Sequence, residues 1–362
     1  ASDVYKRQAN NGVINLGTLA VNGTIALATN GSGDATVVND AGLNFAASTV
    51  GRNLAATATT GNMTDSGALS IGGTTTLTTS ANNATIALDT TTNAFEGAVA
   101  LSTQGASGNV TLIQGASNAL RFATSGVGGN LTVTTGSGSA VTQTGVPTVD
   151  GATDITANEG GNNIRLEGQE NVLTGAVSLD GWNVRLTNAK ALELGTVNAK
   201  GMVATARGAI TQTVPSVITS VGSSTIIAQN SAGNTDYDVT LENAANDFRG
   251  ALILTAGNVR VRDTDDVELG ASTVSGIYKL TAGGAVDDDG ALDIEGTTTI
   301  STDENNAYID LSDTSNAFTG ALTITTNDDS GTDAHVTIDG GTTALVINTS
   351  TIDGDLTLTS GH

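Results

Sequence analysis

The feature that most constrains this sequence is a short motif that sets a large internal repeat. The motif reads Asn-x-Phe-x-Gly and begins at Asn93, Asn246 and Asn316, with an altered copy, "NVLTG", at Asn171. An (Ile/Val)-x-Leu triplet ends five residues before the Asn in all four cases. The four Asn are 78, 75 and 70 residues apart, so the chain consists of related copies of about 75 residues.

A second motif, Val-x-Gly-x-x-x-(Val/Ile/Leu), divides each copy into smaller units. Examples are "VGGNLTV" at Val127, "VDGATDI" at Val149, "VSGIYKL" at Val274 and "IEGTTTI" at Ile294. Neighbouring examples start 22 and 20 residues apart. The Gly indicates a corner that needs positive φ or close backbone approach. Units of about twenty residues with short alternating strands are typical of the coils of a β-solenoid.

These nested periods predict an all-β fold, a right-handed parallel β-helix (β-solenoid), with coils of about 20 residues in a repeat of about 75. A single coil cannot bury its inward face, but coils stacked at the usual strand spacing can. The composition favours this fold, because 46 Gly and 3% aromatic residues leave few large side chains for another kind of core. The alternative is a series of antiparallel hairpins in sandwich domains.

The repeat pattern covers almost the whole chain. We expect one β-solenoid domain over residues 11–362, which reads as a fragment open at both ends. Residues 1–10 do not fit the repeat, and "ASDVYKRQ" resembles translated sequencing-adapter read-through. We therefore treat residues 1–10 as a non-repeat leader.

Charge and composition exclude several classes of partner. The formal charge of −23 repels phosphate backbones and anionic lipids, so we expect no nucleic-acid partner. No apolar run approaches the roughly 20 residues of a spanning helix, so we expect no membrane insertion. There is no cysteine, and therefore neither a disulfide framework nor a thiolate site.

The motif residues are predicted to serve the fold. A Phe in each copy would fill a corner of the core, with burial worth roughly 1.5 to 3 kcal/mol, and the Asn before it would bond backbone at a turn. The alternative role, an aromatic platform for sugars, would need exposed rings in a row. The predicted structural residues are Asn93, Phe95, Gly97, Leu173, Gly175, Asn246, Phe248, Gly250, Asn316, Phe318 and Gly320.

Two acidic clusters are the candidates for chemistry. They contain Asp263, Asp265 and Asp266, and Asp287, Asp288 and Asp289. Thr-Gln-Thr replaces the second trio in two sister copies, and Ala replaces Asp266 in three. Positions that vary in this way are typical of solvated turns, so we expect no catalytic residue and no cofactor. The six Asp remain weak candidates for calcium, because carboxylate and carbonyl oxygens are its usual ligands.

Three alternative functions stay open from the residues. Parallel β-helix enzymes act on polysaccharides with clustered Asp, and a cleft lined by three or more Asp on one face would indicate one. Thr clusters such as "TTTLTT" at Thr74 suggest an ice-binding solenoid, although they recur in some coils only. A calcium-binding, surface-layer-like scaffold is the third. His335 stands where other copies have turn asparagines, so it is predicted to be a turn residue.

The repeats resemble those of bacterial β-strand-repeat exoproteins, similar to filamentous haemagglutinin and autotransporter adhesin passengers. The resemblance rests on "NAFEGAVAL", "NDFRGALIL", "NAFTGALTI", "VGGNLTV" and "AITQT". It implies a non-enzymatic stalk or adhesin segment of a large secreted or surface-displayed protein, acting in cell adhesion or biofilm matrix. The implied partners are a host-cell or matrix surface, whether protein or carbohydrate, and the rest of the same exoprotein.

Overall fold

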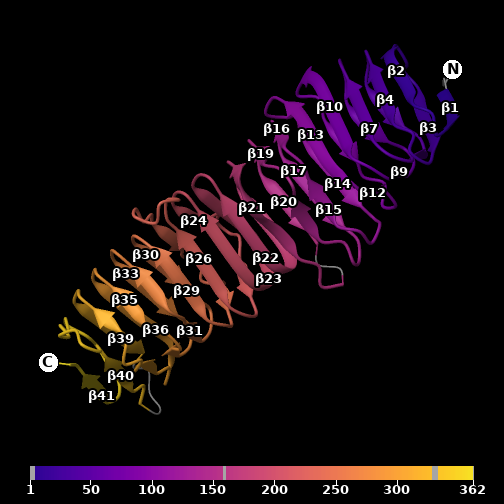
Figure 1. Cartoon of the computed structure of the whole chain (residues 1–362). Coiled ribbons are helices and arrows are strands. Elements are labelled where there is room, and N and C mark those ends of the chain that lie inside the picture. Colours follow the sequence, from indigo (N-terminus) through magenta and orange to yellow (C-terminus); the bar gives the residue numbers. More distant parts are fainter. Residues whose placement is uncertain (1–4, 158–159, 328–332, 362) are drawn as a thin grey trace. The chain divides into compact units, whose positions relative to one another are not determined.

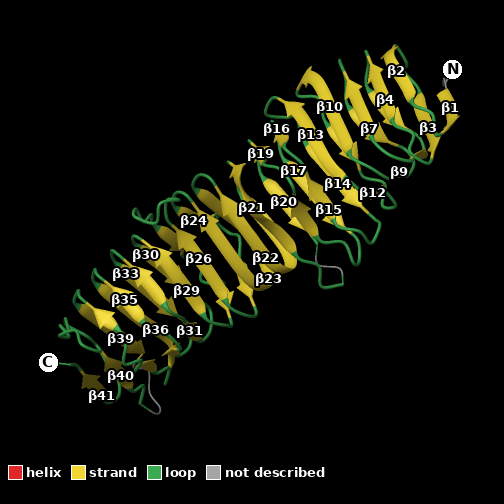
Figure 2. Cartoon of the chain, viewed as in Figure 1, coloured by secondary structure: helices red, strands yellow, loops and turns green. Residues whose placement is uncertain are grey.

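Every regular element that the structure describes is a β-strand. A computed structural model describes residues 5–157, 160–327 and 333–361, and this part of the chain contains no helix (Figure 2). Its paired strands run parallel and stack as a β-solenoid of about 16 turns, with repeats of about 70 to 75 residues. The predicted all-β solenoid is thus confirmed, and the parallel pairing excludes the alternative of antiparallel sandwich domains.

The chain divides into two compact units, Ala1–Thr187 and Asn188–His362 (Figure 1). The strands that begin in the first unit are β1 (Tyr5–Asn10), β2 (Ile14–Leu19), β3 (Thr24–Asn30), β4 (Ala35–Asn39), β5 (Leu43–Phe45), β6 (Ser48–Val50), β7 (Leu54–Ala58), β8 (Met63–Asp65), β9 (Leu69–Ile71), β10 (Thr75–Asn82), β11 (Ile86–Leu88), β12 (Ala94–Phe95), β13 (Ala98–Gln104), β14 (Val110–Gln114), β15 (Leu120–Phe122), β16 (Ser125–Val127), β17 (Leu131–Thr135), β18 (Val141–Gln143), β19 (Pro147–Val149), β20 (Thr153–Thr156), β21 (Ile164–Leu173) and β22 (Val177–Asn188).

The strands of the second unit follow the same order of long and short segments. They are β23 (Leu192–Ala206), β24 (Ile210–Gln212), β25 (Ile218–Ser220), β26 (Ser224–Ala228), β27 (Val239–Leu241), β28 (Asp247–Phe248), β29 (Leu252–Ala256), β30 (Val259–Arg262), β31 (Val267–Leu269), β32 (Ser272–Val274), β33 (Tyr278–Ala282), β34 (Val286–Asp288), β35 (Leu292–Ile294), β36 (Thr298–Asn305), β37 (Ile309–Leu311), β38 (Ala317–Phe318), β39 (Leu322–Asn327), β40 (Val336–Asp339) and β41 (Leu356–Thr359).

The N-terminal segment contributes a strand. Within residues 1–10, β1 pairs in parallel with β3, so that Tyr5 lies opposite Ile25 and Asn10 opposite Asn30. That these residues are a leader outside the repeat, and that the rest is one domain, stay predictions.

A typical coil has one long strand followed by two short ones. In the first unit, β7 is long and β8 and β9 are short, and each stacks on its counterpart in the next coil. Side chains alternate between core and solvent along the long strands, as in the buried-exposed-buried-intermediate-buried pattern of β7. This alternation of small and β-branched apolar residues with Thr, Asn and Ser is what the sequence pattern predicts.

The side of the coil with one long strand and the side with two short strands exchange places at β3, β13 and β29. The long strand β13 stacks on the long strand β10 in the preceding coil, but on the short strands β15 and β16 in the following one. On the other side, the short strand β11 is followed by β14, which begins a new series of longer strands. In the second unit, β29 pairs with β31 and β32 in the same way. The exchange follows the motif Phe in both cases.

The motif glycines allow close contact between successive coils. A Cβ on Gly97 would lie 2.3 Å from the backbone of Gly73, and one on Gly320 would lie 2.1 Å from the carbonyl oxygen of Gly296. Neither glycine has a positive φ. Close backbone approach, one of the two reasons given for the Gly of the Val-x-Gly motif, therefore also explains these glycines of the Asn-x-Phe-x-Gly motif.

Candidate functional site

The residues shared by the copies are buried in the coils. Phe95, Phe248 and Phe318 are 0% exposed, and Leu173 is 2% exposed. The rings lie inside the core and do not form an exposed aromatic platform. The motif Asn residues are buried as well, with 0% exposure at Asn93, Asn171 and Asn246 and 1% at Asn316.

Each motif Asn bonds to the backbone and to one acidic or amide side chain of the preceding coil. Asn93 Oδ1 accepts a hydrogen bond from the Leu69 amide at 2.8 Å, and its Nδ2 donates to Asp65 Oδ2 at 2.6 Å. Nδ2 also donates to the Leu88 carbonyl at 3.3 Å. Asn93 therefore ties its own turn to the coil below, as a side-chain replacement for strand pairing.

The same arrangement explains one of the six acidic candidates. Asn316 Nδ2 donates to Asp288 Oδ2 at 2.6 Å, while Gln143 and Gln212 hold this place opposite Asn171 and Asn246. Burial raises the pKa of Asp288, against the lowering effect of its hydrogen bond with Asn316. Asp288 thus occupies a structural position that Gln fills equally well in two other copies.

A second buried polar position appears every 74 or 75 residues, at Asn39, Gln114, Asn188 and Asp263. Gln114 Oε1 accepts from the Phe95 amide at 2.9 Å, and its Nε2 donates to the Phe95 carbonyl at 3.3 Å. Asp263 Oδ2 accepts from the Phe248 amide at 2.7 Å. Gln114 and Asp263 thus pair with the backbone of the motif Phe where no strand of the next coil does so.

A Ser hydroxyl satisfies the backbone where the two sides exchange. Ser48, Ser125, Ser272 and Ser350 accept from the amides of Leu27, Leu101, Leu254 and Ile324 at 3.0 to 3.1 Å. In β13, Leu101 lies between the part that pairs with β15 and the part that pairs with β16. The sequence analysis missed these Ser, although "NFAASTV", "RFATSGV" and "ELGASTV" repeat around three of them.

Most of the six acidic candidates line a hollow on the second unit. It has a volume of about 560 Å³ and is lined by Arg249, Asp266, Val267, Glu268, Ala285, Asp287, Asp288, Asp289 and Tyr308. We call it the acidic hollow. It brings together four of the six predicted acidic candidates, whereas Asp263 is buried at the motif and Asp265 lies outside the lining.

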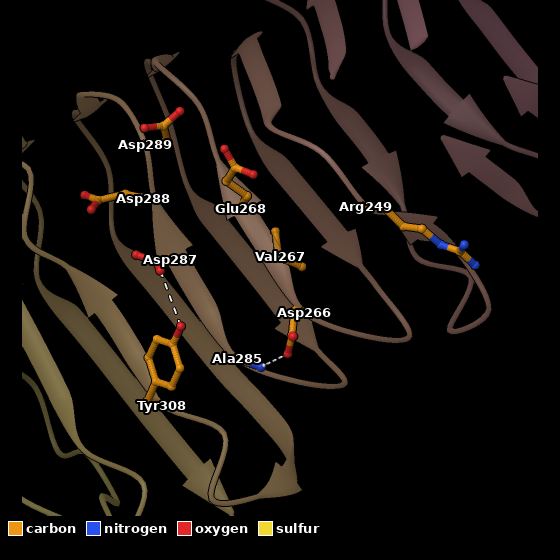
Figure 3. A pocket seen from close by; sticks show the side chains of 9 residues that line it. All are labelled: Arg249, Asp266, Val267, Glu268, Ala285, Asp287, Asp288, Asp289 and Tyr308. Carbon is orange, nitrogen blue, oxygen red and sulfur yellow. Dashed lines mark hydrogen bonds between the residues drawn. The ribbon is translucent and has the colours of Figure 1, made fainter. Parts of the chain in front are cut away.

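Pairing in register makes the acidic hollow strongly negative. Glu268 lies opposite Asp287 on the next strand, and Asp287 lies opposite Asp310 on the one after. Like charges directly opposite each other destabilise a sheet. Tyr308 Oη donates to Asp287 Oδ2 at 3.4 Å, and burial together with the charge of Asp287 raises the pKa of Tyr308 (Figure 3).

The single cation of the lining does not offset this charge. Arg249 lies apart from the carboxylates at one edge of the acidic hollow in Figure 3. Its Nη2 bonds to Asp247 Oδ2 at 2.6 Å, and this hydrogen bond raises the pKa of Arg249. Asp266 Oδ1 accepts from the Ala285 amide, as corner asparagines do elsewhere. In the described ranges, no three His, Cys, Asp or Glu are arranged to hold a metal ion.

A smaller hollow lies on the first unit. It has a volume of about 260 Å³ and is lined by Asn22, Gly23, Gly42, Leu43, Asn44, Asn62 and Thr64. We call it the amide hollow, because three of the seven lining residues are Asn and none is charged. No feature of the sequence analysis pointed to it.

His335 lies at a corner. Its Nδ1 accepts from the Asp355 amide at 3.0 Å, as Asn109 Oδ1 accepts from the Asn130 amide at 2.8 Å and Asn258 Oδ1 from the Ile277 amide at 2.9 Å. His335 thus replaces a corner asparagine, and its ring joins one coil to the next.

The fold and its repeated side-chain bonds define a β-solenoid repeat protein. Residues 32–102, 107–180, 181–255 and 256–325 each match the family described as repeats of unknown function (DUF5649), and the chain belongs to this family. No curated protein and no solved structure matches the chain. Among the residues with described structure there is no helix of sufficient length and apolarity to cross a membrane.

Proposed function

We propose that this chain is a non-enzymatic stalk or adhesin segment of a large secreted or surface-displayed bacterial protein. It would act in cell adhesion or in a biofilm matrix, outside the cell. Its mechanism is mechanical, because hydrogen bonds between coils and a stacked aliphatic core maintain the form that carries a binding surface. Its partners would be a host-cell or matrix surface and the rest of the same exoprotein.

One observation carries this proposal. The polar residues that recur in the copies, such as Asn93, Gln114 and Ser125, are buried and bonded to backbone. A repeated enzyme site would instead present recurring acids, bases or nucleophiles to solvent. The recurring part of this sequence is therefore used for the fold, which supports a structural role for the repeats.

Adhesion of purified protein tests the proposal. Beads coated with the full chain should adhere to cultured epithelial cells or to isolated biofilm matrix more strongly than beads coated with heat-unfolded chain. The same preparation should release no reducing ends or unsaturated uronates from neutral and acidic polysaccharides. Equal adhesion of folded and unfolded chain to every surface, or product release, would contradict it.

The acidic hollow favours a second candidate, a polysaccharide-active β-helix enzyme. Asp266, Asp287, Asp288 and Asp289 line one cleft, which is the feature expected of such an enzyme. Asp288, with its pKa raised by burial, could act as a general acid beside the exposed Asp287. A net negative cleft would repel uronic acids and suits neutral substrates.

Product release again separates the two candidates. An enzyme of this kind would generate reducing ends from neutral polysaccharides, and Asp287→Asn would abolish that release while the chain stayed folded. The structural proposal expects the same zero release from both forms. Release that survives Asp287→Asn would exclude this residue from any such mechanism.

A further inference from the structure

The amide hollow and the acidic hollow occupy the same place in two different copies of the repeat. Asn44 lies between Thr24 and Thr64 in parallel register, and Glu268 lies opposite Asp287 in the matching strands. Phe45 and Leu269 each pair with the start of the long strand before them. Asn44 therefore corresponds to Glu268, and Thr64 corresponds to Asp287.

The correspondence extends through the lining. Six residues of the amide hollow match six of the acidic hollow: Asn22 with Arg249, Gly42 with Asp266, Leu43 with Val267, Asn44 with Glu268, Asn62 with Ala285, and Thr64 with Asp287. The two hollows lie in different units, and their linings have no residue type in common. Their common position must therefore come from the backbone of the repeat.

The exchange of sides explains this position. Each hollow lies just after the motif corner, where a long strand is followed by the first of two short strands. Here a buried side chain, Asn39 or Asp263, bonds the corner backbone in place of a strand. In these two copies the surface lacks one strand at this point and is hollowed there.

The residues that line the hollow differ between the two copies more than the buried residues beside them do. Buried positions next to the hollow keep their chemistry, with Leu43 matched by Val267 and Phe45 by Leu269. The outward positions change from amide to carboxylate, as from Asn44 to Glu268. Repeat proteins commonly combine a constant framework with a variable binding face.

We propose that this hollow is the ligand-binding position of the repeat, and that the amide hollow binds a unit of a neutral saccharide. The inference rests on the proposed adhesin role for why the chain would meet a glycan. The acidic hollow is the same position with a different lining, and it provides an internal contrast.

The chemistry of the amide hollow suits sugar hydroxyl groups. Asn amides and the Thr64 hydroxyl both donate and accept hydrogen bonds, as sugar hydroxyls do. Asn62 Oδ1 accepts from the Thr85 amide at 2.9 Å, and no described residue bonds its Nδ2. Asn44 Oδ1 is buried and has no hydrogen-bond partner among the described residues. The site therefore offers an open donor at Asn62 and carries no charge, whereas Asn44 Oδ1 is unpaired but out of contact with solvent.

The size of the hollow also favours a small neutral ligand. Its volume of about 260 Å³ is below the roughly 300 to 1,000 Å³ of pockets for drug-sized molecules. One or two sugar rings fit this range, with the remaining chain extending over the open rim. The absence of charge in the lining disfavours uronates and amino sugars relative to neutral hexoses.

Titration of the full chain with a defined panel tests the proposal. The probes are cellohexaose, mannohexaose and maltohexaose as neutral glycans, hexagalacturonate as an acidic one and chitohexaose in its deacetylated form as a cationic one. Binding is followed by saturation-transfer NMR and calorimetry. We expect at least one neutral hexamer to bind, and the double variant Asn44→Ala/Asn62→Ala to weaken it roughly tenfold or more through loss of hydrogen bonds.

Two further variants keep the test specific. Asn15→Ala removes an exposed Asn from β2 outside the hollow and should leave affinity unchanged. Asn44→Glu with Thr64→Asp copies the acidic lining and removes the Asn44 amide, so it should weaken neutral-glycan binding, and it should also lower the unfolding temperature because the two carboxylates lie opposite each other. Absence of binding by every neutral hexamer, or binding that survives the hollow variants, would overturn the proposal. Bead adhesion without glycan binding would overturn only the glycan-binding proposal and would leave the proposed adhesin role intact.

Discussion

Asp263 makes the stability of this protein depend on pH in an unusual direction. The side chain is 3% exposed, and its two oxygens accept from the amides of Phe248 at 2.7 Å and Asp265 at 2.9 Å. Burial raises the pKa of Asp263 from 3.8 to about 6, although both hydrogen bonds act to lower it. The folded protein therefore holds a proton at this site more tightly than the unfolded chain does.

The sign of the effect follows from proton linkage. Below pH 3.8 the carboxyl is neutral in both states, and between 3.8 and about 6 only the unfolded chain ionises. The free energy of unfolding contributed by Asp263 therefore falls as the pH rises through this window. A shift of about two pKa units corresponds to about 3 kcal/mol lost above pH 6, and roughly half of it lies above pH 5.

We expect Asp263→Asn to stabilise the protein at neutral and alkaline pH. The amide cannot ionise, and Asn or Gln fills this place in three other copies. The variant loses the acceptor for the Asp265 amide, a loss of about 1 kcal/mol that does not depend on pH. The net change in local stability should be near zero at pH 5 and a gain of about 1 to 2 kcal/mol at pH 8.

Hydrogen exchange measured by mass spectrometry provides the assay. Peptides that span Phe248 and Asp263 report the free energy of local opening, with intrinsic rates corrected for pH. Asp293→Asn, which changes an exposed carboxylate on β35, serves as the control and should show no such pH trend. A difference between variant and parent that stays constant from pH 5 to 8, or a less stable variant at pH 8, would refute the reasoning.

Three further substitutions test the buried contacts. Phe248→Ala should destabilise its copy by about 3 to 5 kcal/mol in denaturant unfolding and leave any glycan binding unchanged, and lost binding with intact stability would contradict a core role. Asn316→Ala leaves the Leu292 amide unpaired and should lower stability by about 1 to 3 kcal/mol, with Asn15→Ala unchanged. Ser125→Ala should increase hydrogen exchange of the Leu101 amide by roughly tenfold. Unchanged exchange would show that the Ser125 hydroxyl does not protect this amide.

The class of fold was predictable because its signals are local and repeated. Alternation of Val, Ile and Leu with polar residues gives the strands, and the twenty-residue period gives the coils. The exchange of sides was not predictable in this way. Whether β13 faces one strand or two depends on pairing between residues more than twenty positions apart, and the role of the Ser at the exchange, such as Ser125, is recognisable only once this pairing is known.

Acidic residues that are close in sequence do not form one site in the structure. Asp263 and Asp265 are two residues apart, but Asp263 is buried and bonds the motif backbone, while Asp265 is exposed. The spacing of the internal repeat indicates the role of Asp263 better than its neighbours in sequence do. Asp263 has counterparts at Asn39, Gln114 and Asn188, but the change of residue type hid the constant spacing.

The amide hollow could not be found from the sequence. Asn22, Asn44 and Asn62 are about twenty residues apart, and each is an ordinary turn or strand residue by itself. They meet only because successive coils stack in register. Binding positions of this kind become visible once the coils are aligned on one another.

Proximity of labels at Ser102 and Gly126 tests most directly that the chain is a parallel solenoid whose sides exchange at the motif. These two exposed residues lie opposite each other on β13 and β16. Because the chain has no cysteine, pyrene maleimide would react only at Cys introduced by Ser102→Cys and Gly126→Cys. We predict strong excimer emission from this pair and none from a Ser102→Cys/Thr132→Cys control on another ladder. Absence of excimer from the first pair, or equal excimer from both, would contradict the account.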